Sequence, residues 1–537
     1  MHVCLLPAEI LLDIFAIIHE DYNSVISHAT LAALARTCRT FKEPALDTLW
    51  KHIDGFEPLV LCFPEGVHDR DVLGLGKLTF IRPPFAREWS IFSQYAHRIR
   101  SLTFEPSESD VIDDRIVQAL ISAPSLTLLP NLCRLHWFND QECFIPLLRC
   151  LLVPTIRSLE LRSSSSGTSW VPSFAKSALL TSLGARCPSI REFKCVYQSD
   201  SEDNSDIISD AVCGSRELFH LETGVLNTQA LYHLASLPSL KSLYFRTYNI
   251  DSTQTDGPEF ISQINLVHIA APSLFALAHC LRNIRFLCCR SVALDIDLNP
   301  WGAPYDPLVV PEFIISFSKH FSPALEHLSV SFEPPLFSLE DEDILADSHF
   351  ALAFDVIAPL LSLSRLTKVD LDWICASAID DASLKRMAQS WPLLQEFYFG
   401  SGCRWLVPPS LTFIGFIYLI QHCPALRTID MTFCACSVDT DSEPFTKTIP
   451  NENITNIFVG MSPIVDPVAV ACQLHTLVPN LSGVDRFGPL LDVDPTSQFR
   501  NIDEGWAKVD EFLMVLNTAA KMRKSVDQAT LECPDAP

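Results

Sequence analysis

A candidate phosphate-binding loop lies at Gly74-Leu75-Gly76-Lys77. In such loops the backbone N–H groups of glycines hold phosphate oxygens, a lysine reaches the terminal phosphates, and a Ser or Thr hydroxyl follows the lysine. Here Leu78 occupies the hydroxyl position, and Asp71 occupies the position of the earlier glycine. The stretch therefore does not predict a nucleotide site.

Thiol chemistry is a second candidate, because the chain has 19 cysteines. None of them forms a Cys-x-x-Cys pair, and Cys434 and Cys436, which flank a single alanine, have no histidine cluster at zinc-site spacing. Many cysteines lie within apolar runs, as Cys288 and Cys289 do. We interpret the cysteines as buried free thiols in a reducing compartment, and we predict no metal and no cofactor.

Carboxylates are concentrated in three acidic runs, which are residues 199–206, 340–343 and 439–443. The spacing of an EF-hand and its glycine are absent, so we interpret each run as a solvated loop and not as a calcium site. Ser199, Ser201 and Ser442 lie in these runs and are candidate phosphorylation sites.

Enzyme motifs are absent: the sequence contains neither a Gly-x-Ser-x-Gly nucleophile turn nor a His-Glu-x-x-His zinc helix. Asp, His and Cys residues are abundant, but accidental pairs are expected in 537 residues. We predict no catalytic residues. An enzyme whose active site is assembled only by the fold is left as an alternative.

Composition favours a folded chain that binds neither nucleic acid nor membranes. Apolar residues make up 48% of the chain and charged residues 19%, and the net charge is −25. Phosphate contacts and anionic membrane surfaces both need clustered Lys and Arg. Glu9 and Asp13 interrupt the first apolar run, so we expect no signal peptide, and residues 411–420 are too short to cross a bilayer. The expected location is cytoplasmic or nuclear.

The elements that carry the strongest pattern are three short helices within the first fifty residues. Pro7 suits the first helical position and Glu9 complements the helix dipole. Apolar residues follow at positions 10, 11, 14, 15, 17 and 18, which is a broad stripe at helical period. Thr30 is predicted to cap a second helix, and Pro44 to open a third. A unit of this size buries too little surface to stand alone, so we expect a partner to cover part of its apolar face.

Read in order, the segments LPAEILLDIF, LAALARTCRTF and PALDTLW resemble an F-box of the form common in filamentous basidiomycete fungi, over residues 5–50. The resemblance implies a helical module that binds a Skp-family adaptor and so joins an SCF-type cullin-RING ubiquitin ligase. It places these residues at the adaptor contact: Leu5, Leu6, Pro7, Ile10, Leu11, Ile14, Leu34, Cys38, Phe41, Leu49 and Trp50. The connection from His19 to Ala29 is longer and more polar than in compact members. An ordinary helical cap on a repeat domain is the alternative.

After a poorly periodic segment at 51–97, one pattern recurs: a helix-like stretch, often a proline, then an apolar residue, two variable residues and a short alternating strand. The strands are predicted within residues 99–104, 130–137, 154–161, 188–193, 218–221, 238–245, 284–287, 323–330, 366–371, 392–399, 424–431, 454–457 and 479–484. Helices are predicted within residues 112–123, 172–186, 228–236, 381–390 and 411–422. Residues 163–166 and 249–263 are expected to form loops.

The spacing of the pattern, roughly 22 to 44 residues, is near that of leucine-rich repeats with insertions. Units of one strand and one helix bury their apolar faces only when stacked. We therefore predict an α/β fold, with a three-helix F-box followed by a leucine-rich-repeat solenoid that has a parallel concave sheet and convex helices. The array is degenerate and is similar to those that follow F-boxes in fungal proteins. An α/β domain of non-repeating topology is the alternative.

The predicted domains are an F-box module at 1–55, a linker at 56–97, the solenoid at 98–488, and a capping helix with a disordered tail at 489–537. A helical pattern over residues 503–524 should cap the last repeat, and residues 530–537 should be disordered. Variable strand positions on the concave face should contact a protein substrate. The candidates are His136, Glu160, Tyr244 and Tyr398.

The sequence as a whole predicts a non-catalytic subunit of a ubiquitin ligase that recognises an unknown protein substrate. The alternative is a repeat scaffold without ligase association, whose N-terminal helices would bury their apolar stripe against the first repeat.

Overall fold

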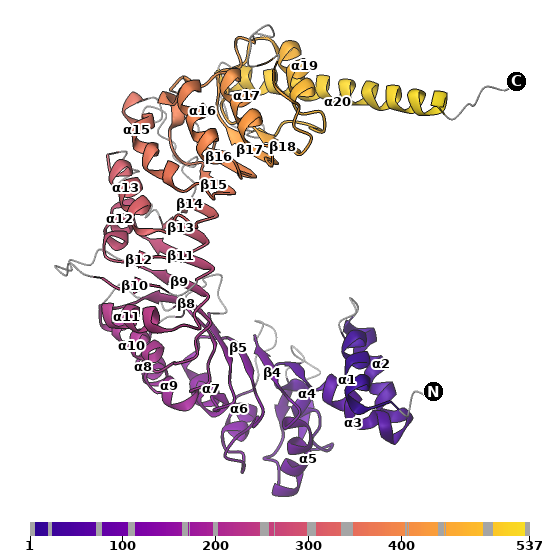
Figure 1. Ribbon diagram of the computed structural model, residues 1–537. Helices are drawn as coiled ribbons and strands as arrows, with labels where there is room; N and C mark the ends of the chain where they lie inside the picture. Colours follow the sequence, from indigo (N-terminus) through magenta and orange to yellow (C-terminus); the bar gives the residue numbers. More distant parts are fainter. Residues whose placement is uncertain are drawn as a thin grey trace, which may run out of the picture. The chain divides into compact units, whose positions relative to one another are not determined.

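The computed structural model describes residues 6–19, 24–70, 78–105, 113–163, 170, 172–196, 202–247, 257–261, 264–297, 308–333, 347–402, 405, 407–438, 445, 447–486 and 498–531. The chain forms two compact units, Met1–Phe245 and Arg246–Pro537. Figure 1 shows the N-terminal helices and, within each unit, strands with helices along one of their faces. The predicted class, α/β with N-terminal helices and a large parallel sheet, is confirmed.

Three helices open the first unit: α1 (Ala8–His19), α2 (Ser24–Thr37) and α3 (Arg39–Leu49). Helix α1 begins directly after Pro7, as predicted. The other two predicted starts are wrong. Thr30 lies inside α2, where its hydroxyl donates a hydrogen bond to the carbonyl of Ile26 at 2.8 Å. Pro44 lies inside α3, which begins after the extended residue Cys38, so burial of Pro44 against its neighbours outweighs the lost backbone donor.

These three helices share one hydrophobic core. It consists of Leu11, Phe15, Leu31 and Ala45, with Leu6, Ile18, Leu34, Ala35, Phe41 and Leu49 packed against it. The rings of Phe15 and Phe41 meet nearly at right angles, with centroids 5.7 Å apart. Edge-to-face contact of this kind adds to the energy of apolar burial and fixes how α1 packs on α3.

Residues 56–97 are more regular than the sequence indicates. They form α4 (Glu57–Val60), the antiparallel strands β2 (His68–Arg70) and β3 (Leu78–Phe80), and α5 (Ala86–Ala96). Aromatic side chains hold them together: the ring of Phe63 lies 5.5 Å from that of Phe80 and 5.3 Å from that of Trp89. Glu88 fixes the start of α5 by accepting hydrogen bonds from the Phe85 N–H and from Arg82. The candidate phosphate loop at 74–77 lies outside the described residues.

The large parallel sheet has 14 strands, and those of the first unit follow the order β1-β4-β5-β6-β7-β8-β9. They are β1 (His52–Asp54), β4 (Ser101–Phe104), β5 (Arg134–Phe138), β6 (Ser158–Arg162), β7 (Glu192–Cys195), β8 (His220–Val225) and β9 (Ser242–Arg246). The helices between them are α6 (Asp114–Ile121), η2 (Glu142–Phe144), α7 (Ile145–Leu151), α8 (Phe174–Thr181), α9 (Leu183–Arg186), α10 (Glu202–Cys213) and α11 (Thr228–Ser236). Alternate strand residues are buried, as expected when helices cover one face of a sheet.

The second unit continues the same alternation in the order β11-β13-β14-β15-β16-β17-β18. Its strands are β11 (Leu266–Ala271), β13 (Ser291–Asp297), β14 (His327–Glu333), β15 (Lys368–Leu371), β16 (Glu396–Phe399), β17 (Thr428–Met431) and β18 (Asn456–Phe458), besides β10 (Glu259–Phe260) and β12 (Arg285–Phe286). Its helices are α12 (Leu274–Arg282), α13 (Val310–His320), η4 (Ser348–Phe350), α15 (Phe354–Ile357), η5 (Ala358–Ser362), η6 (Ala376–Ala378), α16 (Asp381–Ser390), α17 (Phe413–His422), α19 (Pro467–Leu477) and α20 (Gln498–Leu531). In both units we call the sheet face without helices the open face.

Several predicted segments differ from the structure. Residues 284–287 contribute β12 to a separate two-stranded sheet with β10, which itself lies in a predicted loop. The sequence pattern missed β11 and β13, and residues 479–484 form no strand. Of the acidic runs, residues 202–206 begin α10, because the apolar side of that helix packs on α8 and α11. The runs at 340–343 and 439–443 lie outside the described residues.

The C-terminal helix α20 is longer than predicted. Helix α20 packs on α19. Its fully buried residues, about one helical turn apart, are Trp506, Val509 and Leu513. The expectation of disorder from residue 530 onward is wrong for residues 530 and 531, which continue the helix, and residues 532–537 lie outside the described part of the chain.

Candidate functional site

Helix α1 has two apolar faces that differ in exposure. Leu11 and Phe15 are 1% and 3% exposed in the three-helix core, whereas Ile10, Ile14 and Ile17 are 45%, 36% and 70% exposed. Residues at i, i+4 and i+7 lie on one side of a helix. Ile10, Ile14 and Ile17, which we call the α1 stripe, therefore form a continuous apolar strip that a partner can reach.

The residues predicted at the adaptor contact differ in accessibility. Pro7, Ile10 and Ile14 are exposed; Leu6, Leu34, Cys38, Phe41, Leu49 and Trp50 are half-buried; Leu11 is buried; and Leu5 lies outside the described residues. The side chain of Leu11 therefore stabilises the core of the helices and cannot be reached by a partner. Trp50 packs its ring 4.6 Å from that of Tyr95 in α5, so part of its surface is already covered.

Ile17 and Ile26 are two accessible residues that the sequence analysis did not select. Ile26 lies on α2 and is 62% exposed. Ile17 belongs to the apolar pattern of α1, and the signal that could have found it is the i, i+4, i+7 spacing from Ile10.

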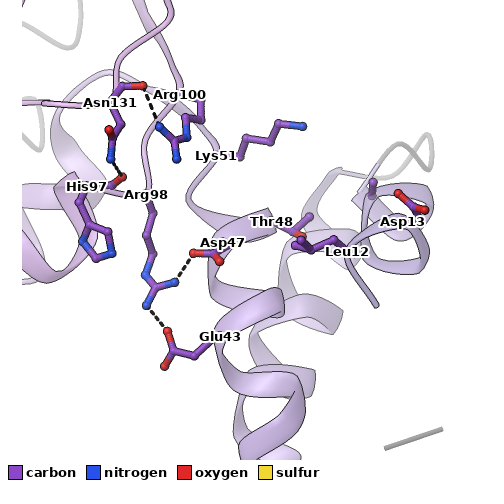
Figure 2. Close-up of a pocket in the computed structure, with 11 residues that line it drawn as sticks. Leu12, Asp13, Glu43, Asp47, Thr48, Lys51, His97, Arg98, Arg100 and Asn131 are labelled. Carbon is purple, nitrogen blue, oxygen red and sulfur yellow. Dashed lines mark hydrogen bonds and ion pairs between the residues drawn. The ribbon is translucent and has the colours of Figure 1, made fainter. Parts of the chain in front are cut away.

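Arg98 joins the helical trio to the start of the first parallel strands. Its guanidinium donates hydrogen bonds to the carboxylates of Glu43 and Asp47, both on α3 (Figure 2). The Arg98 side chain is 11% exposed, while the two carboxylates are about half exposed. The hydrogen bond from Arg98 lowers the pKa of Glu43, so this carboxylate is ionised when it contacts the guanidinium.

A cavity of about 580 Å³ opens beside this contact. It is lined by Leu12, Asp13 and Ala16 of α1, by Glu43, Asp47 and Thr48 of α3, and by Lys51, His97, Arg98, Arg100 and Asn131 (Figure 2). Asn131 donates a hydrogen bond to the His97 carbonyl at 2.7 Å and accepts a long one from Arg100 at 3.4 Å. Basic and acidic side chains are mixed along the wall of this cavity.

Two of the predicted substrate residues contact each other on the open face of the first unit. Nδ1 of His136 lies 2.7 Å from Oε2 of Glu160, and Nε of Arg162 lies 2.7 Å from the other oxygen of Glu160. The hydrogen bond from His136 lowers the pKa of Glu160. Farther along, Glu222 lies 3.7 Å from Arg162 and 3.8 Å from Lys194. Each acid of this network is therefore matched by a base.

Tyr244 and Tyr398, the other two predicted substrate residues, lie on β9 and β16. Both are half-buried, as outward-facing strand residues are. Nζ of Lys368 lies 4.9 Å from the ring centroid of Tyr398 and 3.0 Å from the carboxylate of Glu396. Burial and the nearby carboxylates raise the pKa of Tyr398 to about 12. Tyr398 belongs to the second unit, so the structure does not group it with His136 and Glu160.

The cysteines of the described residues are all free thiols. Burial raises the pKa of several of them, among them Cys187 and Cys423, each to about 12. The prediction that they are buried is wrong for Cys143, Cys436 and Cys472, which are exposed. Sequence runs of apolar residues identified the core thiols but not those at loop and helix surfaces.

Within the described ranges no three His, Cys, Asp or Glu side chains are arranged to hold a metal ion. Over the same part of the chain no helix has both the length and the hydropathy needed to span a membrane.

Comparison with known proteins identifies the N-terminal helices. The model of the F-box-like family matches residues 3–55, which covers α1 to α3 and β1. No curated protein matches the chain at a significant level. The order of the three helices, their shared core and the family match agree over the same residues, and the chain thus contains an F-box-like domain at residues 3–55.

Proposed function

We propose that this protein is the substrate-recognition subunit of an SCF-type cullin-RING E3 ubiquitin ligase. The F-box-like domain would bind a Skp-family adaptor, and the solenoid-like α/β array would bind the target protein. The observation that carries the proposal is the exposed α1 stripe on a domain that matches the F-box-like family. F-box domains generally bind adaptors of the Skp type.

The apolar stripe supplies a physical reason for adaptor binding. Complete burial of an isoleucine side chain contributes about 1.5–3 kcal/mol, and Ile10, Ile14 and Ile17 retain between 36% and 70% of their exposure. Covering all three would favour association by a few kcal/mol before the cost of ordering two proteins is subtracted. Exposed Ile26 on α2 would extend the same kind of contact.

The remaining parts of the proposal follow from this role. We infer that the array consists of degenerate leucine-rich repeats over residues 98–488, between a segment at 56–97 and a C-terminal cap at 489–537. The subunit would not be catalytic itself: it would hold a captured protein near the ubiquitin-loaded enzyme, so that proximity accelerates transfer. Arg98 supports this role because it ties α3 to residues beside β4. The protein would act in the cytoplasm or the nucleus.

A scaffold without ligase association is the competing function. That function predicts a helical cap whose apolar stripe is buried against the first repeat. The exposure of the α1 stripe supports the ligase subunit instead, since α1 contacts α2 and α3 and leaves these three isoleucines uncovered.

Co-purification with a Skp-type adaptor tests the proposal. The full chain is compared with the double variant Ile10→Asp, Ile14→Asp, whose changes lie at exposed positions and spare the core residues Leu11 and Phe15. Phe174→Asp is the matched control, because Phe174 is 91% exposed on α8, outside the F-box-like domain. Circular dichroism and thermal unfolding establish that all three proteins are folded.

We expect the native chain and Phe174→Asp to form a stoichiometric complex with the adaptor and the double variant to lose it. A native chain that does not bind, or a folded double variant that binds as well as the native chain, would overturn the ligase proposal and leave the scaffold function in its place.

A further inference from the structure

Acidic and aromatic side chains alternate across the open face of the second unit. In the strand register, Asp370 of β15 is the partner of Tyr398 in β16, and Tyr398 is the partner of Asp430 in β17. The row continues from Asp430 to Phe458 of β18, and Phe458 forms an isolated bridge with Asp485. We call these five residues, each on a successive strand or bridge, the acid–aromatic ladder.

The ladder lies at the surface of the sheet. Asp370, Tyr398, Asp430 and Phe458 are half-buried and Asp485 is exposed, while their strand neighbours Val369, Phe397 and Ile429 are completely buried. Because successive strand residues point to opposite faces, the ladder side chains belong to the open face and the buried neighbours to the helix-covered face.

The charges of the ladder act on one another. Burial, followed by the carboxylates of Asp372, Asp370 and Asp485, raises the pKa of Asp430 to about 7. Burial, and to a lesser degree the carboxylate of Asp372, also raise the pKa of Asp370. A hydrogen bond that the Ser329 hydroxyl donates at 2.9 Å and the charge of Lys368 act in the opposite direction. Among the described residues, the cation next to Asp485 in the chain is Arg486, and it is held by Asp503 and Asp510 of α20.

The open face of the first unit is a useful contrast. There, Glu160 and Glu222 contact Arg162, and Lys194 lies near Glu222. Opposite charges compensate one another in that network. In the ladder Lys368 acts on Asp370, but the side-chain charges that act on Asp430 are those of carboxylates, and Tyr398 and Phe458 are its partners in the strand register. A positive group from another molecule would therefore gain more at the ladder than at the first unit.

Lys368 shows which group this surface accepts. Its ammonium contacts both the ring of Tyr398, at 4.9 Å from the centroid, and the carboxylate of Glu396, at 3.0 Å. Cations are attracted to the faces of aromatic rings, and a nearby carboxylate strengthens the attraction. The ladder repeats this pairing of ring and carboxylate on the strands that follow.

We propose that the acid–aromatic ladder binds an extended segment of the captured protein that carries lysine or arginine side chains. The inference rests on the proposed function in that it names the substrate class of the same subunit. Alternate strands of a sheet are about 9.6 Å apart. Asp370, Asp430 and Asp485 lie on alternate positions across the sheet, so their carboxylates should be spaced by about that distance. A polyproline II segment repeats its side-chain direction every three residues, about 9.3 Å, so cations three residues apart match the ladder.

Fluorescence anisotropy with the full chain tests the proposal. The probe is a labelled nonapeptide of three Lys-Pro-Pro repeats, and a peptide of the same composition with its three lysines consecutive tests the spacing. With the assay at pH 8, above the pKa of about 7 of Asp430, the double variant Asp370→Asn, Asp430→Asn removes two ladder carboxylates while keeping side-chain size. The control Glu192→Gln, Glu222→Gln removes the same number of carboxylates from the open face of the first unit.

We expect the repeat probe to bind the native chain, to bind the ladder variant at least tenfold more weakly, and to bind the control variant within twofold of the native chain. The consecutive-lysine peptide should bind more weakly than the repeat probe. Equal losses in the two variants would overturn the inference, because attraction to the net charge of the chain would then explain the binding. No binding of the repeat probe at 150 mM salt would overturn it as well.

Adaptor co-purification of the ladder variant separates the two proposals. If the variant keeps the adaptor and loses the probe, the ladder acts as proposed. If the native chain binds the adaptor but not the probe, the ladder inference fails while the ligase proposal stands. If the chain binds the probe but not the adaptor, the ladder keeps its cationic partner and the ligase proposal fails.

Discussion

The guanidinium of Arg98, beside the start of β4, is hydrogen-bonded to the carboxylate of Glu43 in α3, which lies 55 positions earlier in the chain. The contact crosses from the F-box-like helices to the segment that starts the parallel strands. It makes the placement of α3 depend on a side chain outside the domain that the family match covers.

Replacing Arg98 with Gln should lower the free energy of unfolding of the first unit by about 1 kcal/mol, the upper end for an ion pair whose acids are solvated. Urea unfolding followed by tryptophan fluorescence measures the change. Arg191→Gln is the control, because Arg191 and its partner Glu217 are both more than half exposed, and this variant should unfold like the native chain. Equal destabilisation of the two variants would contradict a special role for Arg98.

Adjacent residues of α1 should respond in opposite ways to truncation. Leu11→Ala empties a buried position and should cost about 2–5 kcal/mol of stability, whereas Ile10→Ala should change stability little and weaken adaptor binding. Thermal unfolding and adaptor titration of both variants provide the comparison. A stable Leu11→Ala protein would show that the core of the three helices is not packed as described.

Asp430→Asn should stabilise the protein at pH 8. Burial and three neighbouring carboxylates raise the pKa of Asp430 to about 7 in the folded state, above its value in the unfolded chain. The folded state therefore binds more protons between about pH 4 and pH 7, and the cost of ionising Asp430 is fully present above pH 7. The melting temperature of the variant should exceed that of the native chain at pH 8, and the difference should shrink toward pH 5. A variant that is less stable than the native chain at pH 8 would show that ionised Asp430 is not destabilised by burial and its neighbouring carboxylates.

His52 should make the protein less stable as the pH falls. Burial, and then the charges of Arg134, Lys51 and His19, lower its pKa to about 4, with Asp54 opposing them. Since the unfolded chain takes up the proton near pH 6.5 and the folded chain does not, stability is lost between about pH 6.5 and pH 4. His52→Asn should flatten the pH dependence of the melting temperature over this range. An unchanged slope would mean that other groups cause the acid sensitivity.

Much of the strand order was predictable, because a buried apolar residue lies three positions before the first buried residue of most strands. Leu394 before Phe397 and Leu426 before Ile429 are examples, and both follow a proline. Strands β11 and β13 have the same arrangement, with Ile264 and Cys289 in the leading position, each 1% exposed, but without the proline. A missing proline does not by itself hide a strand, because residues 99–104, 218–221 and 366–371 were predicted as strands without one.

The candidate site was less predictable, because helical period gives the width of an apolar stripe but not the side that faces inward. Positions 10 and 11 are both apolar, and packing of α2 and α3 decides that Leu11 is covered and Ile10 is not. The ladder depends on strand register between Asp370 and Asp485, which are far apart in the chain. The spacing of residues within one segment does not indicate which residues pair across strands. The sequence analysis therefore identified Tyr398 but not its acidic neighbours.

The ladder also bears on how recognition could change during evolution. Each of its strands contributes one side chain, and β16 and β17 each follow a helix of their own, α16 and α17, in a separate stretch of sequence. Duplication or deletion of one such stretch would add or remove one position without redesigning the others. A family built this way could lengthen or shorten the segment that it recognises in single steps, while the N-terminal helices stay unchanged.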